Sequence, residues 1–315
     1  MSIANPHESA RIQTSNLPHG NVIIGLFAIG PMTDFEPTVF HDDLAIYSTG
    51  AGEPLLLMPY PHGFGVAPIV QGPLADVLRE LKQCVISFDP PGAFKTTRPA
   101  QVNMPEMLGC AEETLSVLKI AEPITLVGHS MGGFCAIAYA LAQPERVKRV
   151  ILIGSLASAS AIHRAKGLPW GNWLTGRDRF HYIYWGLRLS WGLGGNLALH
   201  KQMLHLLTYA SFVDKNLAPP VPLEQSDRRR PAPVRDVWPR TIFANRLDYR
   251  ARLSEICVPA LIVAGRFDPQ APVLCSEEIA LGIPGAQLVI FEQSGHYPYI
   301  EERPLLQHTL ADFLS

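Results

Sequence analysis

The chain has 315 residues, of which 47% are hydrophobic and 17% are charged, and this composition excludes a disordered chain and supports a sizeable core. Its formal net charge is −2 and its calculated isoelectric point is about 6.6, with no dominant basic stripe, so we expect no nucleic-acid partner. No apolar run approaches the length of a membrane span, and the polar first 20 residues lack the apolar region of a secretion signal. We therefore expect a cytoplasmic protein with no membrane partner.

The five cysteines are odd in number and scattered, and none shows the CxxC or Cys/His spacing of a metal site. We expect free, buried, apolar side chains in a reducing compartment at Cys84, Cys110, Cys135, Cys257 and Cys275. No metal cluster and no phosphate-binding glycine loop is evident in the sequence either. It therefore predicts catalysis without a metal or a cofactor.

Strand-like and helix-like stretches alternate along the first half of the chain, after a loose arm over about residues 1–20. The predicted strands are 22–27, 44–47, 54–59, 84–88, 124–127 and 150–153, and the predicted helices are about 74–81, 105–120 and 131–143. The run at 54–59 is apolar throughout and ends in turn residues, as expected for a strand buried on both faces. This alternation predicts right-handed crossovers and a doubly wound, mostly parallel α/β sheet.

The alternation stops between residues 155 and 245, where we predict an inserted helical cap. This interval holds all five tryptophans, and it carries twelve lysines and arginines against five acidic residues, for a net charge of +7. The remainder of the chain then carries −9. A solvated face is the simpler interpretation of the run at Arg228–Arg230, and core packing is the simpler one for any single tryptophan. The predicted division is therefore a core of residues 1–154 and 246–315 with a cap of residues 155–245, and the pocket candidates in the cap are Trp170, Trp173 and Trp185.

The alternation resumes after the cap with predicted strands at 260–265 and 287–291 and predicted helices at about 271–281 and 304–314. Asp268 comes just after the first of these strands, and His296 comes just after the second. In open α/β sheets the functional residues gather at the carboxyl ends of the strands. We therefore expect Asp268 and His296 to lie at the same edge of the sheet.

The motif Gly128-His129-Ser130-Met131-Gly132 lies between a predicted strand and a predicted helix. This is the context of a nucleophile elbow, in which the serine sits on a strained turn and the glycines leave room for it. Ser130 would then present its hydroxyl above the sheet, and the backbone N–H of Met131 would point at the negative charge that develops on a reacting carbonyl. Each of the three residues also has a purely structural interpretation. Ser130 could cap a helix, Asp268 could cap a helix or form a turn, and His296 could be a histidine of the core.

The order Ser130, Asp268, His296 is that of the triad in α/β-hydrolases, and the chain resembles this superfamily over nearly its whole length. The stretches at 265–269, 283–286 and 294–298 are most similar to capped serine hydrolases related to proline iminopeptidases. The resemblance implies that His296 takes a proton from Ser130 as Ser130 attacks a carbonyl. Asp268 would hold the imidazole in the right tautomer and stabilise its protonated form.

The loop after the strand at 54–59 is expected to supply the second donor of the oxyanion hole. His62-Gly63 matches the His-Gly step of the superfamily, so the donor would be the N–H of Phe64, and both His62 and Gly63 are also pocket candidates. His62 and His129 are expected to orient loops through hydrogen bonds. Phe64-Gly65-Val66 replaces the Gly-Pro-Gly of proline iminopeptidases.

A second departure follows the strand at 84–88. Phe94 stands where relatives usually have a second glycine after Gly92, and Asp89 is expected to anchor this loop.

Four functions fit these residues. The first is a serine hydrolase that cleaves a small ester, thioester or amide through an acyl-enzyme, without a cofactor. The same triad serves a C–C bond hydrolase or lyase, or an aminopeptidase of the proline iminopeptidase type. A non-catalytic receptor with the same fold is the alternative from another class. The tryptophan-rich, basic cap favours a small-molecule substrate that is apolar or aromatic and either neutral or anionic.

Overall fold

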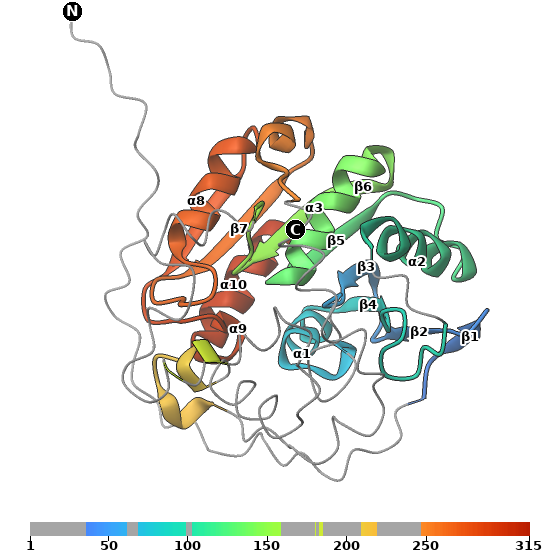
Figure 1. The fold of residues 1–315 in the computed structure, drawn as a ribbon, viewed down its shortest axis with the longest axis horizontal. Coiled ribbons are helices and arrows are strands. Elements are labelled where there is room, and N and C mark those ends of the chain that lie inside the picture. The colour runs from blue at the N-terminus through green and yellow to red at the C-terminus, as the bar shows by residue number, and fades with distance from the viewer. Residues whose placement is uncertain are drawn as a thin grey trace, which may run out of the picture. The chain divides into compact units, whose positions relative to one another are not determined.

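The computed structural model describes residues 36–61, 69–98, 103–158, 180, 183–184, 209–218 and 247–315. In this part of the chain, eight strands form one sheet in the order β1-β2-β4-β3-β5-β6-β7-β8 (Figure 1). Strands β4, β3, β5, β6, β7 and β8 pair in parallel, which confirms the mostly parallel sheet. The bounds are β1 Val39–His41, β2 Leu44–Thr49, β3 Glu53–Met58, β4 Gln83–Phe88, β5 Ile124–His129, β6 Val147–Ile153, β7 Ala260–Gly265 and β8 Gln287–Phe291.

One edge of the sheet is antiparallel, because β1 pairs with β2 and β2 pairs with β4 in that direction. The sequence did not predict β1, which has only three residues and is mostly exposed. Asp42 and Asp43 connect β1 to β2 with φ angles of 42° and 65°. Two consecutive positive φ angles are typical of the tight hairpin turn whose twist matches the flanking strands.

The helices lie close to their predicted positions. The first, α1, begins with a proline, and the N–H of Glu106 in α2 donates to Asn103 Oδ1 at 2.9 Å, which caps that helix. A separate short helix, α9, precedes the last one and was not predicted. The bounds are α1 Pro73–Glu80, α2 Met104–Val117, α3 Met131–Ala142, α8 Val273–Gly282, α9 Pro298–Glu301 and α10 Arg303–Leu314, with 3₁₀ turns η1 Ile69–Gln71, η2 Pro144–Arg146, η3 Lys215–Leu217 and η4 Arg250–Glu255.

Alternate residues of the central strands pack on two faces of the sheet. Leu56 and Leu126 belong to one buried cluster with residues of α2, α3 and α8. Helices α1, α9 and α10 contact one another, and they supply the buried side chains of Leu74 and Leu310 outside that cluster. Because side chains alternate along a strand, helices therefore cover both faces, and the fold is the doubly wound one expected.

The cysteines differ in part from the prediction. All five are free, and Cys110, Cys135 and Cys275 are buried as expected. Cys84 is only partly buried, and Cys257 is exposed because it follows the surface turn η4. Among the described helices, none combines the length and the apolar character that crossing a membrane requires.

The two ends of the predicted cap interval lie side by side. Ser158 and Asp248 form an isolated antiparallel bridge, and the N–H of Tyr249 donates to the carbonyl of Ala157 at 2.9 Å. An insertion between β6 and β7 requires its two ends to lie close together in this way. Most of residues 155–245 and the predicted arm and strand at 1–20 and 22–27 lie outside the described residues, so these assignments stay predictions.

Helix α8 allows a matched test of the core. Ile279 is fully buried in the main cluster, whereas Leu281 on the same helix is 84% exposed. We expect Ile279→Ala to lower the free energy of unfolding by about 2–5 kcal/mol, since it removes buried methyl groups and leaves a cavity. Leu281→Ala should change it by about 0.5 kcal/mol or less. Urea unfolding measures both, and equal losses would contradict the packing of α8.

Candidate active site

Ser130 occupies the sharp turn between β5 and α3, with φ 53° and ψ −123°. Its N–H donates to Ile153 O at 2.9 Å, and its carbonyl accepts a hydrogen bond from Ser155 Oγ at 3.0 Å. A Cβ on Gly132 would lie 2.4 Å from Met58 O, so only glycine lets α3 approach β3 this closely. The predicted strand, strained turn and helix are therefore present, and the turn is held from β6.

Asp268 and His296 form a buried hydrogen-bonded pair beyond the ends of β7 and β8. Asp268 Oδ2 lies 2.7 Å from His296 Nδ1, and both side chains are almost completely buried. Asp268 Oδ1 accepts the N–H groups of Gln270 and Ala271 at 2.8 and 2.9 Å. Because the carboxylate can only accept, Nδ1 carries the proton, and Nε2 of a neutral imidazole is left as the basic nitrogen.

The three predicted catalytic residues follow β5, β7 and β8. Gly154, the residue after β6, lies between Ser130 and the other two. Gly154 follows Ile153, the acceptor of the Ser130 N–H. A Cβ on Gly154 would lie 3.1 Å from Asp268 Oδ2 and 3.2 Å from His296 Nδ1. The pair therefore lies directly beside the nucleophile turn. Within the described contacts, no hydrogen bond joins the Ser130 hydroxyl to His296, and such bonds often form only with substrate bound.

His129 is a buried hydrogen-bonding residue next to the triad. Its Nε2 lies 2.8 Å from the carbonyl oxygen of His296, so Nε2 must carry a hydrogen. The other nitrogen, Nδ1, then accepts from the hydroxyl of Tyr60. Burial, with a smaller contribution from His296, lowers the pKa of His129 well below its usual value of 6.5. A neutral His129 thus ties the residue before the nucleophile to the histidine loop, in line with the structural role expected for it.

The structure describes only one of the residues predicted for the oxyanion hole and the substrate pocket. Met131 is the first residue of α3, and N–H groups of a first helical turn have no acceptor within the helix. This leaves the Met131 N–H available for an oxyanion. The other predicted residues of these sites lie outside the described residues, namely His62, Gly63, Phe64, Trp170, Trp173 and Trp185.

The loop after β4 is anchored as expected. Asp89 Oδ2 accepts the hydroxyl of Tyr47 at 2.8 Å and the N–H of Lys95 at 3.0 Å. Phe94, which stands at the position of the second glycine in relatives, has φ 49°. The loop therefore keeps the left-handed turn that a glycine adopts freely, although L-residues other than Asn and Asp rarely do so.

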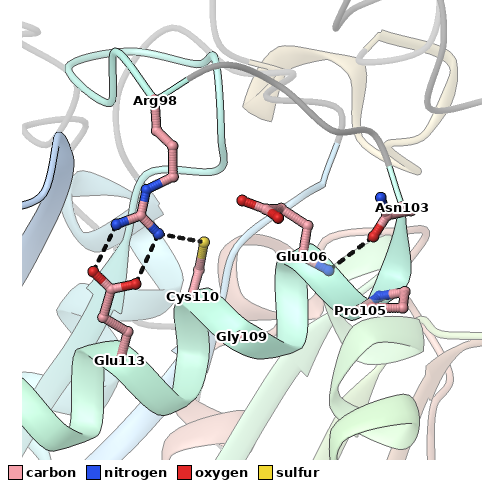
Figure 2. A pocket seen from close by; sticks show the side chains of 7 residues that line it. All are labelled: Arg98, Asn103, Pro105, Glu106, Gly109, Cys110 and Glu113. Atoms are coloured by element: carbon pink, nitrogen blue, oxygen red, sulfur yellow. Dashed lines mark hydrogen bonds and ion pairs between the residues drawn. The ribbon is translucent and has the colours of Figure 1, made fainter.

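A hollow of about 510 Å³ opens over α2, and none of the three predicted catalytic residues lines it (Figure 2). The Arg98 guanidinium contacts both oxygens of Glu113 at 2.6 and 2.7 Å and reaches Cys110 Sγ at 3.8 Å. Burial raises the pKa of the Cys110 thiol to about 11, so the thiolate, which is the nucleophilic form, is not populated at neutral pH. We therefore assign no catalysis to this hollow.

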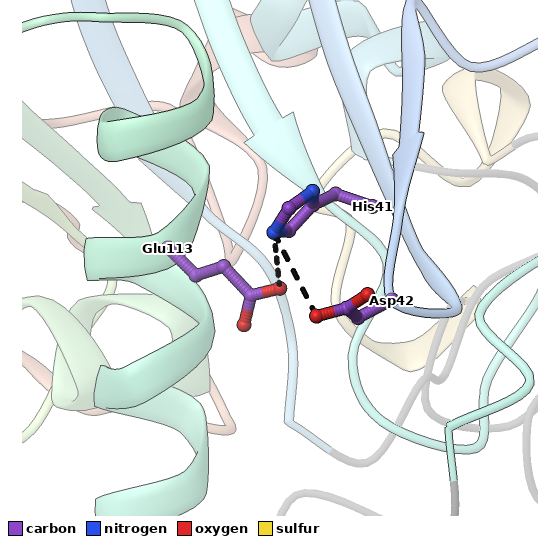
Figure 3. Close-up of side chains that lie close together, drawn as sticks. All are labelled: His41, Asp42 and Glu113. Carbon is purple, nitrogen blue, oxygen red and sulfur yellow. Dashed lines mark ion pairs between the residues drawn. The ribbon is translucent and has the colours of Figure 1, made fainter.

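The structure brings together three possible metal ligands that the sequence did not identify. His41 Nε2 lies 3.8 Å from Asp42 Oδ2 and 3.9 Å from Glu113 Oε1 (Figure 3). Both oxygens of Glu113 already bind the Arg98 guanidinium. A cation at this position would lie beside that positive charge, so the cluster is better described as an ion-pair network than as a metal centre.

The buried neutral His129 predicts a pH dependence of stability. Below pH 6.5 the unfolded chain binds a proton at His129 that the folded chain does not bind. The free energy of unfolding should therefore fall with decreasing pH by up to about 1.4 kcal/mol per unit through this group, and above pH 6.5 the effect vanishes. His129→Gln, which keeps a donor for His296 O, should flatten the slope between pH 6.5 and 5 in urea unfolding.

His308 provides the control, because its side chain on α10 is 75% exposed. His308→Gln should leave the slope as it is in the original protein. A slope that is unchanged in His129→Gln as well would contradict a neutral, buried His129.

Several residues that build this site carry no signal in the sequence. Tyr60 and Ser155 act through hydrogen bonds, and Gly154 acts through close packing. Such residues have no fixed spacing from the triad, so no motif indicates them.

A family model for the alpha/beta hydrolase fold matches residues 60–303. A 2-hydroxymuconate semialdehyde hydrolase from a Pseudomonas species is 28% identical and covers 86% of this chain and 89% of its own. A 2-hydroxy-6-oxononadienedioate/2-hydroxy-6-oxononatrienedioate hydrolase from Paraburkholderia phymatum is 29% identical, and the match covers 85% of this chain and 89% of that protein. An alpha/beta fold family hydrolase from Bacillus anthracis has a similar structure, with a TM-score of 0.66 at 22% identity over 86% and 95% of the two chains. With the elbow and the triad order, these matches show that the chain belongs to the α/β hydrolase fold family of enzymes.

Proposed function

We propose that the protein is a serine hydrolase in which Ser130 is the nucleophile, His296 the general base and Asp268 the residue that orients His296. The observation that carries this proposal is the buried 2.7 Å bond between Asp268 and His296 beside the strained turn at Ser130. His296 Nε2 takes the hydroxyl proton as Ser130 Oγ bonds to a substrate carbonyl carbon. The N–H groups of Met131 and Phe64 stabilise the oxyanion. Collapse of the tetrahedral intermediate expels the leaving group, and water then releases the acyl group from Ser130.

The bond that we propose for cleavage is a carbon–carbon bond of an anionic, conjugated oxo acid. The two relatives described above are named for substrates with carbonyl and carboxylate groups and without an ester or amide. A hydrolase can divide such a molecule only at a carbon–carbon bond. The predicted cap has a net charge of +7, which would attract the carboxylate groups of such a substrate.

When the leaving atom is carbon, the reaction needs a way to stabilise the resulting carbanion. When the bond breaks, its electron pair stays on carbon as an enolate, which must be delocalised and then protonated. The conjugated 2-oxo acid delocalises the charge, and His296, protonated in the first step, is the group that can return the proton. The triad therefore supplies both halves of the reaction without a further acid.

Ester hydrolysis is the second candidate, because attack on an ester follows the same steps up to the acyl-enzyme and an alcohol leaves without enolate chemistry. The five tryptophans of the predicted cap interval favour aryl or medium-chain acyl groups for it. An aminopeptidase of the proline iminopeptidase type has less support. It must hold an ammonium group near carboxylates, and the cap interval has only five acidic residues.

We propose a small-molecule substrate and a cytoplasmic location.

Ser130→Ala should remove labelling by a fluorophosphonate probe and lower turnover by several orders of magnitude, on the order of 10⁶ if it behaves as the nucleophile of subtilisin does. Mass spectrometry should place the adduct on the peptide that contains Ser130. Ser116, an exposed serine of α2, is the control, and Ser116→Ala should label at the original rate. An adduct on another serine would exclude Ser130 as the nucleophile.

The pair should act as a unit with Ser130. Asp268→Asn combined with His296→Ala is expected to be little worse than His296→Ala alone, since residues of one catalytic unit are not additive. Steady-state kinetics of the two single variants and the double variant measures this. Additive losses would place Asp268 or His296 outside the catalytic unit.

We expect kcat/KM, relative to the uncatalysed rate, to be highest for 2-hydroxymuconate semialdehyde or 2-hydroxy-6-oxononadienedioate, followed by p-nitrophenyl esters. Loss of the absorbance of the conjugated acid measures the first reaction, and p-nitrophenolate release measures the second. L-Prolyl p-nitroanilide and its N-acetyl counterpart form the matched pair for peptidase activity. A preference for the free amine over the acylated anilide would favour the aminopeptidase instead.

A further inference from the structure

A short segment of the predicted cap interval, residues 211–213, contacts the loop that carries the catalytic histidine. We call it the docked segment; it lies within residues 209–218, which Figure 1 shows in yellow close to α9. The carbonyl of Ser211 accepts the N–H of His296 at 2.9 Å. The ring of Phe212 stacks on that of Tyr297 with centroids 4.8 Å apart. The backbone of His296 is therefore held from outside the core sheet.

The docked segment also reaches the loop of the catalytic acid. Ser211 Oγ accepts a hydrogen bond from Gln270 Nε2 at 2.8 Å. The backbone N–H of Gln270 is one of the two donors that hold Asp268 Oδ1. The docked segment thus binds His296 directly and Asp268 through Gln270.

Glu301, at the end of α9, joins the docked segment to the histidine loop. Its Oε1 accepts the N–H of Val213 at 2.6 Å, and its Oε2 accepts the N–H of Gly295 at 2.8 Å. Burial raises the pKa of this carboxyl, and backbone N–H groups, including those of Val213 and Gly295, act in the opposite direction. One carboxylate therefore satisfies a donor from each segment, and the contact is lost if either segment moves away.

Gly295 permits this close approach. A Cβ at Gly295 would lie 2.0 Å from the carbonyl oxygen of Ser211, far inside van der Waals contact. Substitution by alanine therefore requires the docked segment to move, while the Gly295 N–H that binds Glu301 is retained. This makes Gly295→Ala a steric probe of docking that is independent of the carboxylate.

We propose that Glu301 is a positioning residue that couples the docked segment to His296, so that the catalytic base is correctly placed only when this part of the cap interval is seated. The proposal rests on the proposed function, because it treats His296 as the base that serves Ser130. It adds a residue that touches neither the substrate nor the reacting atoms. Seating of the segment would then control kcat through the position of the imidazole.

Glu302, the next residue, provides a matched control. Its Oε2 accepts the N–H of Gln293 at 3.0 Å and the hydroxyl of Ser294 at 2.6 Å. It holds the same histidine loop, but in the described contacts it does not reach the docked segment. Glu302→Gln therefore removes the same charge from the same loop without acting on residues 211–213.

The test compares Glu301→Gln, Gly295→Ala and Glu302→Gln in the full-length protein by fluorophosphonate labelling and amide hydrogen exchange. Glu301→Gln and Gly295→Ala should slow labelling and lower kcat by roughly tenfold to a hundredfold, with a smaller change in KM. Exchange at the amides of Val213 and His296 should rise by roughly tenfold in both. Glu302→Gln should raise exchange at Gln293, leave that at Val213 unchanged and slow labelling less than Glu301→Gln does.

Equal slowing of labelling by Glu301→Gln and Glu302→Gln, with Val213 exchange unchanged, would overturn the coupling and make Glu301 a simple loop anchor. Normal labelling of Gly295→Ala despite faster Val213 exchange would overturn it as well. If the original protein is not labelled at all, the proposed function fails, whereas the exchange data still report on the contact between Glu301 and the docked segment.

Discussion

The carboxylate of Asp268 is the group on which the arrangement of this sheet edge depends. A carboxylate that is almost entirely removed from water is costly unless each oxygen has a hydrogen-bond partner. Two backbone N–H groups satisfy one oxygen, and the imidazole of His296 satisfies the other. Those partners come from a tight turn after β7 and from the loop after β8. The requirement to satisfy one buried charge therefore fixes both loops relative to each other, and with them the tautomer of the base.

Hydrogen bonds hold Ser130 on several sides as well. Its N–H is bound by the end of β6, and Ser155 binds its carbonyl. His129, one residue earlier, donates to the carbonyl of His296. A strained φ of 53° persists only where the surroundings determine it. Two of these bonds hold the turn at Ser130 from β6 and from Ser155, and the third connects this turn to the loop of His296.

The sequence predicts the parallel strands, the elbow and the triad order because these depend on apolar runs and on side chains at fixed places. The elements it misses depend on other signals. Strand β1 is too short and too exposed to show a pattern, and α9 has only four residues. Glu301 and Ser211 accept backbone N–H groups, which every residue except proline possesses, so no residue type marks their partners. Phe94 shows a further limit, because its backbone keeps a turn that its side chain disfavours.

The charge distribution along the chain connects the proposed substrate with the predicted cap. The predicted core carries −9 and would repel the anionic substrate that we propose, whereas the predicted cap carries +7 and would attract it. Lys215, close to the docked segment, favours the ionised form of Glu301 and brings the same sign of charge to the contact with the core. Screening limits such effects to about 8–10 Å at physiological salt, so they act only where the cap interval lies against the core. The positive charge of this interval would thus favour the proposed anionic substrate in the same way as Lys215 favours the carboxylate of Glu301. If both proposals hold, substrate binding and the placement of His296 therefore favour the same seated arrangement of the docked segment.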